Sequence, residues 1–211
     1  EERCRSGAPL QNPALLYAGQ ELVIPGEGAG LLPPPFVSID VRPLPVLEGQ
    51  TLVVVVQTTE PVALEGTLFE RSLRFAEEAG VYYALAGVHV FTEPGLYGLE
   101  VAAVDGQGQR TAVSTSLVVQ ANRSYYERID VSSDKSNLLA PDVVAAEAAR
   151  LNSVNATFTP QRQWSAPLLR PVPGTISSYF GTRRSYEGGP YTSYHSGTDI
   201  RAPGGTPVAA A

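Results

Sequence analysis

The chain has 211 residues, 43% of them hydrophobic, which is enough to bury the core of one large or two modest domains. Its formal net charge of −6 argues against an electrostatic grip on nucleic acid, which needs clustered positive charge. The 20 glycines and 18 prolines are above average but below the level that indicates disorder, so short strands joined by many turns are expected.

The cysteine and methionine counts say little about the compartment. One cysteine cannot form an internal disulfide, and no apolar run approaches the length of a membrane span. Because the chain contains no methionine, we expect it to be an internal segment of a longer protein. A signal peptide or membrane anchor could then precede Glu1, although none is seen in the sequence.

The first 35 residues divide into a short structured run and a linker. A turn at 18–20 leads into a short strand at 22–24, which Pro25 stops. The run N-P-A-L-L-Y-A-G-Q-E-L-V-I-P at 12–25 resembles the closing part of a LysM domain, a module that binds peptidoglycan and chitin, and its alternative is an ordinary turn and edge strand. We therefore predict the C-terminal part of a LysM module at 1–25 and a Pro/Gly linker at 26–35.

Residues 36–120 show the spacing of strands and turns that is typical of an Ig-like β-sandwich. About seven short strands are expected, and the Asp-Gly-Gln-Gly turn at 105–108 predicts a hairpin. The continuous β-branched run at 52–56 predicts a strand covered on both faces. A strand is also expected at 88–91, with His89 facing away from its neighbours as a structural or surface residue. This module carries no recognisable chemistry, so we expect a spacer or interaction domain.

A connecting segment at 121–165 follows. A strand is expected at 124–131, and the only convincing helix lies near 141–151, with Pro141 at its first position. Val143, Val144 and Leu151 mark a weak apolar stripe, which predicts that the helix packs on a neighbouring domain.

The terminal stretch, 166–211, carries two residues of metal-ligand type. A strand is expected at 175–180, and His195 and Asp199 then stand four residues apart. An extended strand would separate them by about 13 Å, too far to share a zinc ion whose ligand bonds are about 2 Å, so the pair requires a bend at Ser196 and Gly197. On spacing alone, a hydrogen bond between the imidazole and the carboxylate on a loop remains the simpler interpretation.

The surrounding sequence favours the metal. The pattern Pro-x-x-Gly-x-Ile-Ser-Ser-x-Phe-Gly-x-Arg, then His-x-Gly-x-Asp-Ile, then Ala-Pro-x-Gly-Thr-Pro-Val resembles the opening of the lysostaphin-like (LytM-type) zinc metalloendopeptidases of peptidoglycan. The resemblance covers about the last forty-five residues. The matching residues are Pro171, Gly174, Ile176, Ser177, Phe180, Gly181, Arg183, His195, Gly197, Asp199, Ile200, Ala202, Pro203, Gly205, Thr206, Pro207 and Val208.

The resemblance implies the first part of a β-rich peptidase domain of the duplicated hybrid motif, so that the chain as a whole is mainly β. It also implies that His195 and Asp199 are two of three Zn²⁺ ligands, with the third ligand and the catalytic base in a downstream His-x-His beyond residue 211. Arg183 would bind a substrate carboxylate or brace its loop, and Tyr194 would line the cleft or pack. Gly174, Gly181 and Gly205 are expected to serve tight turns.

The function implied by the resemblance is zinc-dependent hydrolysis of peptide bonds in peptidoglycan by an exported protein of the periplasm, cell wall or extracellular space. Two alternatives remain. The protein could be a degenerate, non-catalytic relative that binds the wall or regulates other enzymes, or a pure binding protein that acts through its LysM-like end and Ig-like module. A His-x-His within the next eighty or so residues of the gene would separate the enzyme from its degenerate relative.

Overall fold

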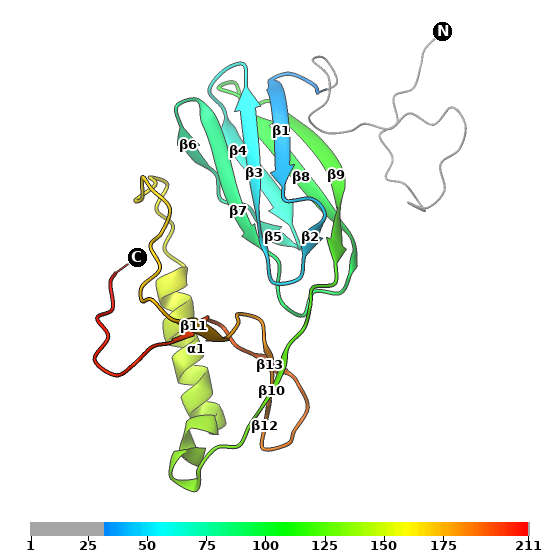
Figure 1. Cartoon of the computed structure of the whole chain (residues 1–211). Coiled ribbons are helices and arrows are strands. Elements are labelled where there is room, and N and C mark those ends of the chain that lie inside the picture. The colour runs from blue at the N-terminus through cyan, green and yellow to red at the C-terminus, as the bar shows by residue number, and fades with distance from the viewer. Residues whose placement is uncertain (1–31, 211) are drawn as a thin grey trace. The chain divides into compact units, whose positions relative to one another are not determined.

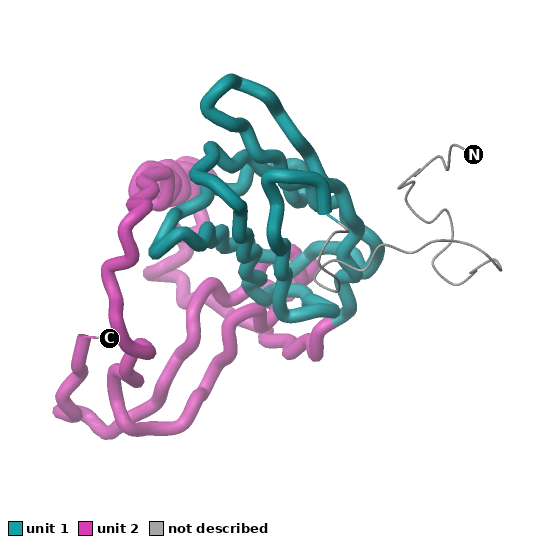
Figure 2. The backbone as a smooth tube through the Cα atoms, turned by 90° about the horizontal axis from the view of Figure 1, so that it is seen from above, with its two compact units in different colours: residues 1–121 teal, residues 122–211 magenta. Residues whose placement is uncertain are grey.

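The computed structural model describes residues 32–210. The chain divides into two compact units between Ala121 and Asn122, and Figure 2 colours them separately. The fold is mainly β, as predicted. The LysM-like run at 1–25 and most of the predicted linker at 26–35 lie outside the described residues.

The first unit is a sandwich of two sheets with the strand order of an Ig-like domain (Figure 1). The four-stranded sheet has the order β1 (Phe36–Arg42), β3 (Thr51–Thr58), β7 (Val81–Gly87) and β6 (Ala76–Glu78). The five-stranded sheet has the order β2 (Val46–Leu47), β9 (Arg110–Gln120), β8 (Gly95–Val104), β4 (Ala63–Leu68) and β5 (Arg71–Ser72). All neighbours are antiparallel except β2 and β9, because the chain leaves β1 and crosses to the edge of the other sheet as β2. The predicted sandwich is confirmed, and two of its nine strands are only two residues long.

The core of this unit lies between the two sheets. Its members alternate along the strands, since successive side chains point to opposite faces. The buried cluster consists of Phe36, Ile39, Val41, Val46, Leu52, Val54, Val56, Leu68, Ala84, Val88, Leu99, Val101, Ala103, Leu117 and Val119. The prediction that the run at 52–56 is covered on both faces is wrong, because Val53 and Val55 face outward and are half-buried. The unbroken β-branched run instead reflects the position of β3 between β1 and β7.

The side chain of Tyr97 stabilises the start of β8. The hydroxyl of Tyr97 donates a hydrogen bond of 2.7 Å to the carbonyl oxygen of Glu93, four residues upstream. The Tyr97 ring also meets Phe69 edge to face, with centroids 5.0 Å apart. This is the arrangement that Ig-like sandwiches use at the corner before the corresponding strand.

The turn between β8 and β9 is confirmed as a hairpin. The carboxylate of Asp105 accepts hydrogen bonds of 2.8 Å from the backbone N–H groups of Gln107 and Gln109. Gly108 has φ +83°, a conformation that glycine adopts without steric cost.

The strand predicted at 88–91 is wrong. The backbone N–H of Val88 donates to the carbonyl of Gln50 and closes the end of the sheet, so the following residues form a turn. Val88 and Val90 are nevertheless buried, while His89 is exposed and its Nδ1 accepts a hydrogen bond from the backbone two residues on. The expected surface position of His89 is therefore confirmed, although the backbone is not a strand.

The second unit contains two small sheets. One has the order β10 (Tyr126–Ile129), β12 (Arg183–Tyr186) and β13 (Ser193–Tyr194), and the other pairs β11 (Thr175–Ser178) with β14 (Asp199–Arg201). The strand expected at 124–131 is present as β10, and it pairs in parallel with β12. The segment predicted as a connection thus supplies an edge strand to the terminal stretch.

The helical part of this unit comprises the 3₁₀-helix Ser133–Leu139 and α1 (Pro141–Asn155). Pro141 occupies the first helical turn, as predicted, and the helix runs four residues beyond the expected end at 151. No residue of α1 is buried, and Leu151 is 57% exposed. The expected packing of its weak apolar stripe on a neighbouring domain therefore has no counterpart within the described residues and stays a prediction. Within residues 32–210, neither helix is long and apolar enough to cross a bilayer.

Candidate metal centre

The two small sheets of the second unit bring His195 and Asp199 together. His195 extends the ladder of β12 and β13, because its N–H donates to Thr182 and its carbonyl accepts from Gly181. Asp199 begins β14, where it pairs with Ser178 of β11. The chain bends at Gly197 as it passes from one sheet to the other, which confirms the bend that the spacing requires.

The side chains of the pair lie at the distance expected for two ligands of one zinc ion. His195 Nε2 is 3.3 Å from Asp199 Oδ1. Nitrogen and oxygen ligands stand about 2.0–2.1 Å from zinc, so at the tetrahedral angle they are about 3.3–3.4 Å from one another. The bent backbone therefore brings these two groups together, whereas an extended strand would separate them by about 13 Å.

The other ring nitrogen of His195 is held by the end of β11. Nδ1 lies 3.0 Å from Ser178 Oγ and 3.3 Å from the carbonyl oxygen of Tyr179. A carbonyl can only accept a hydrogen bond, so its contact with the ring favours the tautomer that carries the proton on Nδ1. A second hydrogen-bond partner of this kind fixes the tautomer and the ring orientation of metal-binding histidines.

This tautomer leaves a lone pair on Nε2 directed at a carboxylate oxygen. Two lone-pair atoms 3.3 Å apart repel one another unless a proton or a metal cation lies between them. A cation shared by Nε2 and Oδ1 would relieve this repulsion.

The pair is buried on the histidine side and open on the carboxylate side. His195 is 8% exposed, whereas the Asp199 side chain is 57% exposed. A Cβ added at Gly197 would lie 3.8 Å from His195 Nε2, so glycine keeps this side of the ring clear. A ligand could therefore approach the pair from solvent without rearrangement of the ring.

The side chains of His195 and Asp199 are both of types that bind zinc. A neutral imidazole nitrogen and a carboxylate oxygen are both zinc ligands, and a catalytic site requires three protein ligands with an open position. Within residues 32–210, no group of three or more His, Cys, Asp and Glu side chains is arranged to hold a metal ion. His195 and Asp199 therefore stay two candidate ligands, and their assignment to zinc stays a prediction from the resemblance.

The other two predicted site residues lie beside the pair on paired strands. Arg183 stands opposite Tyr194 in the register of β12 and β13. The Nε of Arg183 donates to Ser124 Oγ at 3.4 Å, a contact that favours the bracing role over substrate binding. Tyr194 meets Phe180 edge to face at 6.0 Å, which favours its packing role.

The glycines of the motif act in two different ways. Gly181 and Gly205 have φ of +82° and +84°, as tight turns require. Gly174 has no such φ; a Cβ there would collide with the backbone carbonyl of Arg201. Gly174 ends the bend at 171–174 that leads into β11, as predicted, and its lack of a side chain also allows β11 and β14 to approach.

Ser178 and the Tyr179 carbonyl are the contributors that the sequence did not single out. Both lie in the Ile-Ser-Ser-Tyr-Phe run, but the resemblance gave neither residue a role. Along β11 only Ser178 is buried, whereas Thr175, Ile176 and Ser177 are exposed, so no alternating pattern in the sequence marks Ser178.

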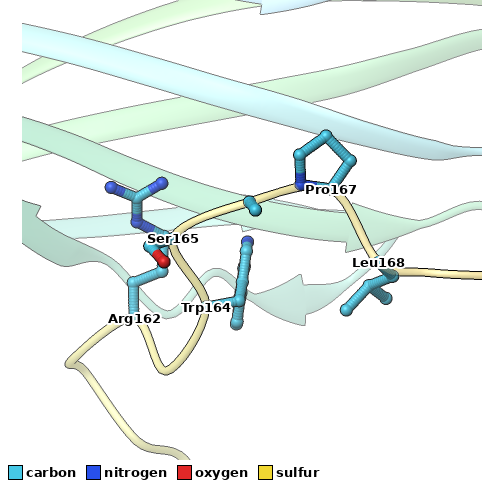
Figure 3. Close-up of a pocket in the computed structure, with 6 residues that line it drawn as sticks. Arg162, Trp164, Ser165, Pro167 and Leu168 are labelled. Carbon is cyan, nitrogen blue, oxygen red and sulfur yellow. The ribbon is translucent and has the colours of Figure 1, made fainter. Parts of the chain in front are cut away.

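A separate hollow of about 270 Å³ lies in the segment before β11 (Figure 3). It is lined by Arg162, Trp164, Ser165, Ala166, Pro167 and Leu168. The lining includes no imidazole or carboxylate, so this hollow lacks the ligand chemistry of the His195–Asp199 pair.

No family model and no curated protein matches the chain. Partial likeness exists to a polysaccharide lyase, at 16% identity and TM-score 0.32 over 41% of this chain and 12% of the lyase. The titin domains Z1Z2 in complex with telethonin are 16% identical at TM-score 0.30, over 46% of this chain and 57% of that one. The protein SGBP-B of Bacteroides ovatus, solved with a mixed-linkage heptasaccharide, is 15% identical at TM-score 0.23 over 40% and 23% of the two chains. The chain thus spans less than two thirds of each of these structures, and likeness at this level carries no argument about function.

Proposed function

We propose that this chain is part of an exported zinc-dependent endopeptidase that cleaves peptide bonds in bacterial peptidoglycan. The observation that carries the proposal is the His195–Asp199 pair, whose Nε2 and Oδ1 atoms lie 3.3 Å apart. The lysostaphin-like pattern around the pair supplies the reaction and the substrate class. Peptidoglycan is the partner that this reaction requires, and export follows from its location.

Each residue of the pair has a distinct task in this proposal. His195 offers the lone pair of Nε2, while Ser178 and the Tyr179 carbonyl hold the proton on Nδ1. Asp199 offers a carboxylate oxygen, whose negative charge offsets part of the charge of a divalent cation. Zinc, when bound, supplies Lewis acidity toward a carbonyl and lowers the pKa of a water molecule to near neutrality.

The remaining groups of the proposed site come from the resemblance. A third ligand and a general base would be supplied by a His-x-His beyond residue 211. The open carboxylate side of the pair leaves room for these groups and for a peptide, because the Asp199 side chain is 57% exposed.

The experiment compares histidine variants of the full-length protein on purified peptidoglycan. The measured quantities are zinc content, by atomic emission, and release of new amino groups from the polymer. His195→Ala and Asp199→Ala should lose both zinc and amino-group release. The matched control is His89→Ala, because His89 is the only other histidine of the chain and lies exposed in the first unit.

Two outcomes would contradict the proposal. Equal activity in His195→Ala and His89→Ala would remove the pair from the chemistry. A folded, zinc-loaded protein that releases no amino groups from any peptidoglycan type would leave the non-catalytic relative as the better description.

A further inference from the structure

The turn between β11 and β12 meets the ring of His195 at one atom, the carbonyl oxygen of Tyr179. This turn comprises residues 179–182, and the N–H of Thr182 closes it with a hydrogen bond of 3.2 Å to that oxygen. Gly181, its third residue, has φ +82°, as in type II turns. The same oxygen lies 3.3 Å from His195 Nδ1, so the turn supplies one of the two contacts of this ring nitrogen.

The hydroxyl of Thr182 makes the shortest contact to this oxygen. Thr182 Oγ1 donates to the Tyr179 carbonyl at 2.8 Å, against 3.2 Å for the Thr182 N–H and 3.3 Å for His195 Nδ1. Thr182 is only 5% exposed, so its hydroxyl depends on this acceptor and not on water. The bond therefore fixes the direction of the carbonyl, because rotation of the Tyr179 peptide unit would bury a hydroxyl whose hydrogen bond is broken.

Thr182 also fixes the backbone of His195. The N–H of His195 donates to the Thr182 carbonyl at 2.8 Å, and the N–H of Gly181 donates to the His195 carbonyl at 2.9 Å. Thr182 thus holds the histidine through its main chain and holds the acceptor that the ring meets through its side chain. The ring and that acceptor are positioned by the same residue.

The carbonyl is the contact that distinguishes the two neutral tautomers of His195. Ser178 Oγ, 3.0 Å from Nδ1, can donate or accept, so its contact fits that nitrogen with or without a proton. The Tyr179 carbonyl only accepts, so its contact favours the proton on Nδ1. Because a histidine binds a metal through a nitrogen that carries no proton, this tautomer leaves Nε2, which faces Asp199, for the metal.

We propose that Thr182 is a positioning residue that sets the tautomer of His195. By holding the Tyr179 carbonyl at Nδ1, Thr182 keeps the proton on that nitrogen and the lone pair on Nε2. Thr182 stands between Gly181 and Arg183, at an unspecified position of the lysostaphin-like pattern, so the resemblance gives it no role. The purpose of this arrangement rests on the proposed function, whereas the tautomer is a property of the chain without metal.

NMR of the ring nitrogens in the isotopically labelled full-length protein tests the proposal, because their chemical shifts show which nitrogen carries the proton. A chelator removes zinc, the pH keeps the ring neutral, and His195→Ala identifies the signals of this histidine. The unaltered protein should carry the proton mainly on Nδ1. Thr182→Val keeps the β-branched shape but loses the hydroxyl. It should raise the ratio of the Nε2–H to the Nδ1–H tautomer about threefold to fivefold, the effect of weakening one hydrogen bond. Thr182→Ser retains the hydroxyl and should restore the original ratio.

The matched control is Thr206→Val, because Thr206 ends a turn of the same construction. Its N–H and Oγ1 both bond to the carbonyl of Pro203, at 3.2 and 2.7 Å, and Gly205 before it has φ +84°. Within residues 32–210, the Pro203 carbonyl is not among the contacts of the His195 ring. Thr206→Val should therefore leave the tautomer ratio unchanged.

Three outcomes would overturn the positioning role of Thr182. They are an unchanged ratio in Thr182→Val, an equal change in Thr182→Ser or Thr206→Val, and a proton on Nε2 in the unaltered protein. Thr182→Ala, which also lacks the hydroxyl, gives the same comparison if the amide spectrum shows that valine distorts the turn. Release of amino groups from peptidoglycan does not enter these measurements, so failure of the positioning role and failure of the proposed enzyme are distinguishable.

Discussion

Substitution of Ser178 by alanine tests whether the hydrogen bonds to His195 serve the metal. Ser178 Oγ is the nearer of the two partners of Nδ1, at 3.0 Å, and the Tyr179 carbonyl is the farther, at 3.3 Å. Loss of an outer partner of a metal-binding histidine typically costs about 10–100-fold in metal affinity. Because the carbonyl remains as an acceptor, we expect Ser178→Ala to lie near the lower limit, about tenfold, or about 1.4 kcal/mol.

The assay is competition for zinc between the full-length protein and a chromophoric chelator. Ser177→Ala is the matched control, since Ser177 is adjacent, exposed and on the other face of β11, with its Oγ 3.5 Å from the Asp199 carbonyl. Ser178→Thr retains a hydroxyl and should restore most of the affinity. Urea unfolding of the same variants separates a loss of metal affinity from a loss of fold.

A zinc affinity of Ser178→Ala equal to that of the unaltered protein would refute this reasoning. The ring of His195 would then be oriented by the Tyr179 carbonyl and by packing alone. A tenfold loss in both variants would instead trace the effect to β11 as a whole.

The other predictions concern the fold and the isolated chain. Gly174→Ala should destabilise the second unit by about 3 kcal/mol or more in urea unfolding, since its Cβ would meet a backbone carbonyl, whereas Gly204→Ala, with no atom within 4 Å of the added Cβ, should not. Tyr97→Phe should lower the free energy of unfolding of the first unit by about 1 kcal/mol, because the 2.7 Å hydrogen bond to the Glu93 carbonyl is lost. An unchanged urea midpoint would contradict a stabilising role of this hydrogen bond. The chain 1–211 alone should bind zinc weakly in calorimetric titration, and tight stoichiometric binding that is lost in His195→Ala would contradict this expectation.

Local sequence patterns were sufficient to predict the sandwich but not where each of its strands ends. Alternating residues in β1 and the Asp105 turn depend on near neighbours, and the structure confirms both. The run at 88–91 alternates equally well, yet the ladder ends where Val88 N–H bonds to the carbonyl of Gln50, the residue directly before β3. Such an end is set by the partner strand and has no signature in the run itself.

The candidate metal site likewise depends partly on local sequence and partly on contacts between residues far apart in the chain. The bend at Gly197 followed from the spacing and from ligand bond lengths, which are local arguments. The partners of Nδ1 lie 16 and 17 residues earlier in the chain, where no period or motif spacing connects them to His195. The resemblance predicted His195 and Asp199 as ligands, and only the packing of two small sheets shows which groups contact the other nitrogen of His195.

The sequence and the structure place the start of the candidate peptidase domain at different residues. The lysostaphin-like pattern begins after residue 166, but the second compact unit begins at Asn122. β10 pairs with β12 along four residues, and Glu127 forms a 3.0 Å ion pair with Arg184, whose side chain is only 18% exposed. Removal of this strand would expose one edge of β12, the strand whose ladder continues to His195. The segment predicted as a connection is therefore part of the fold that supports the His195–Asp199 pair.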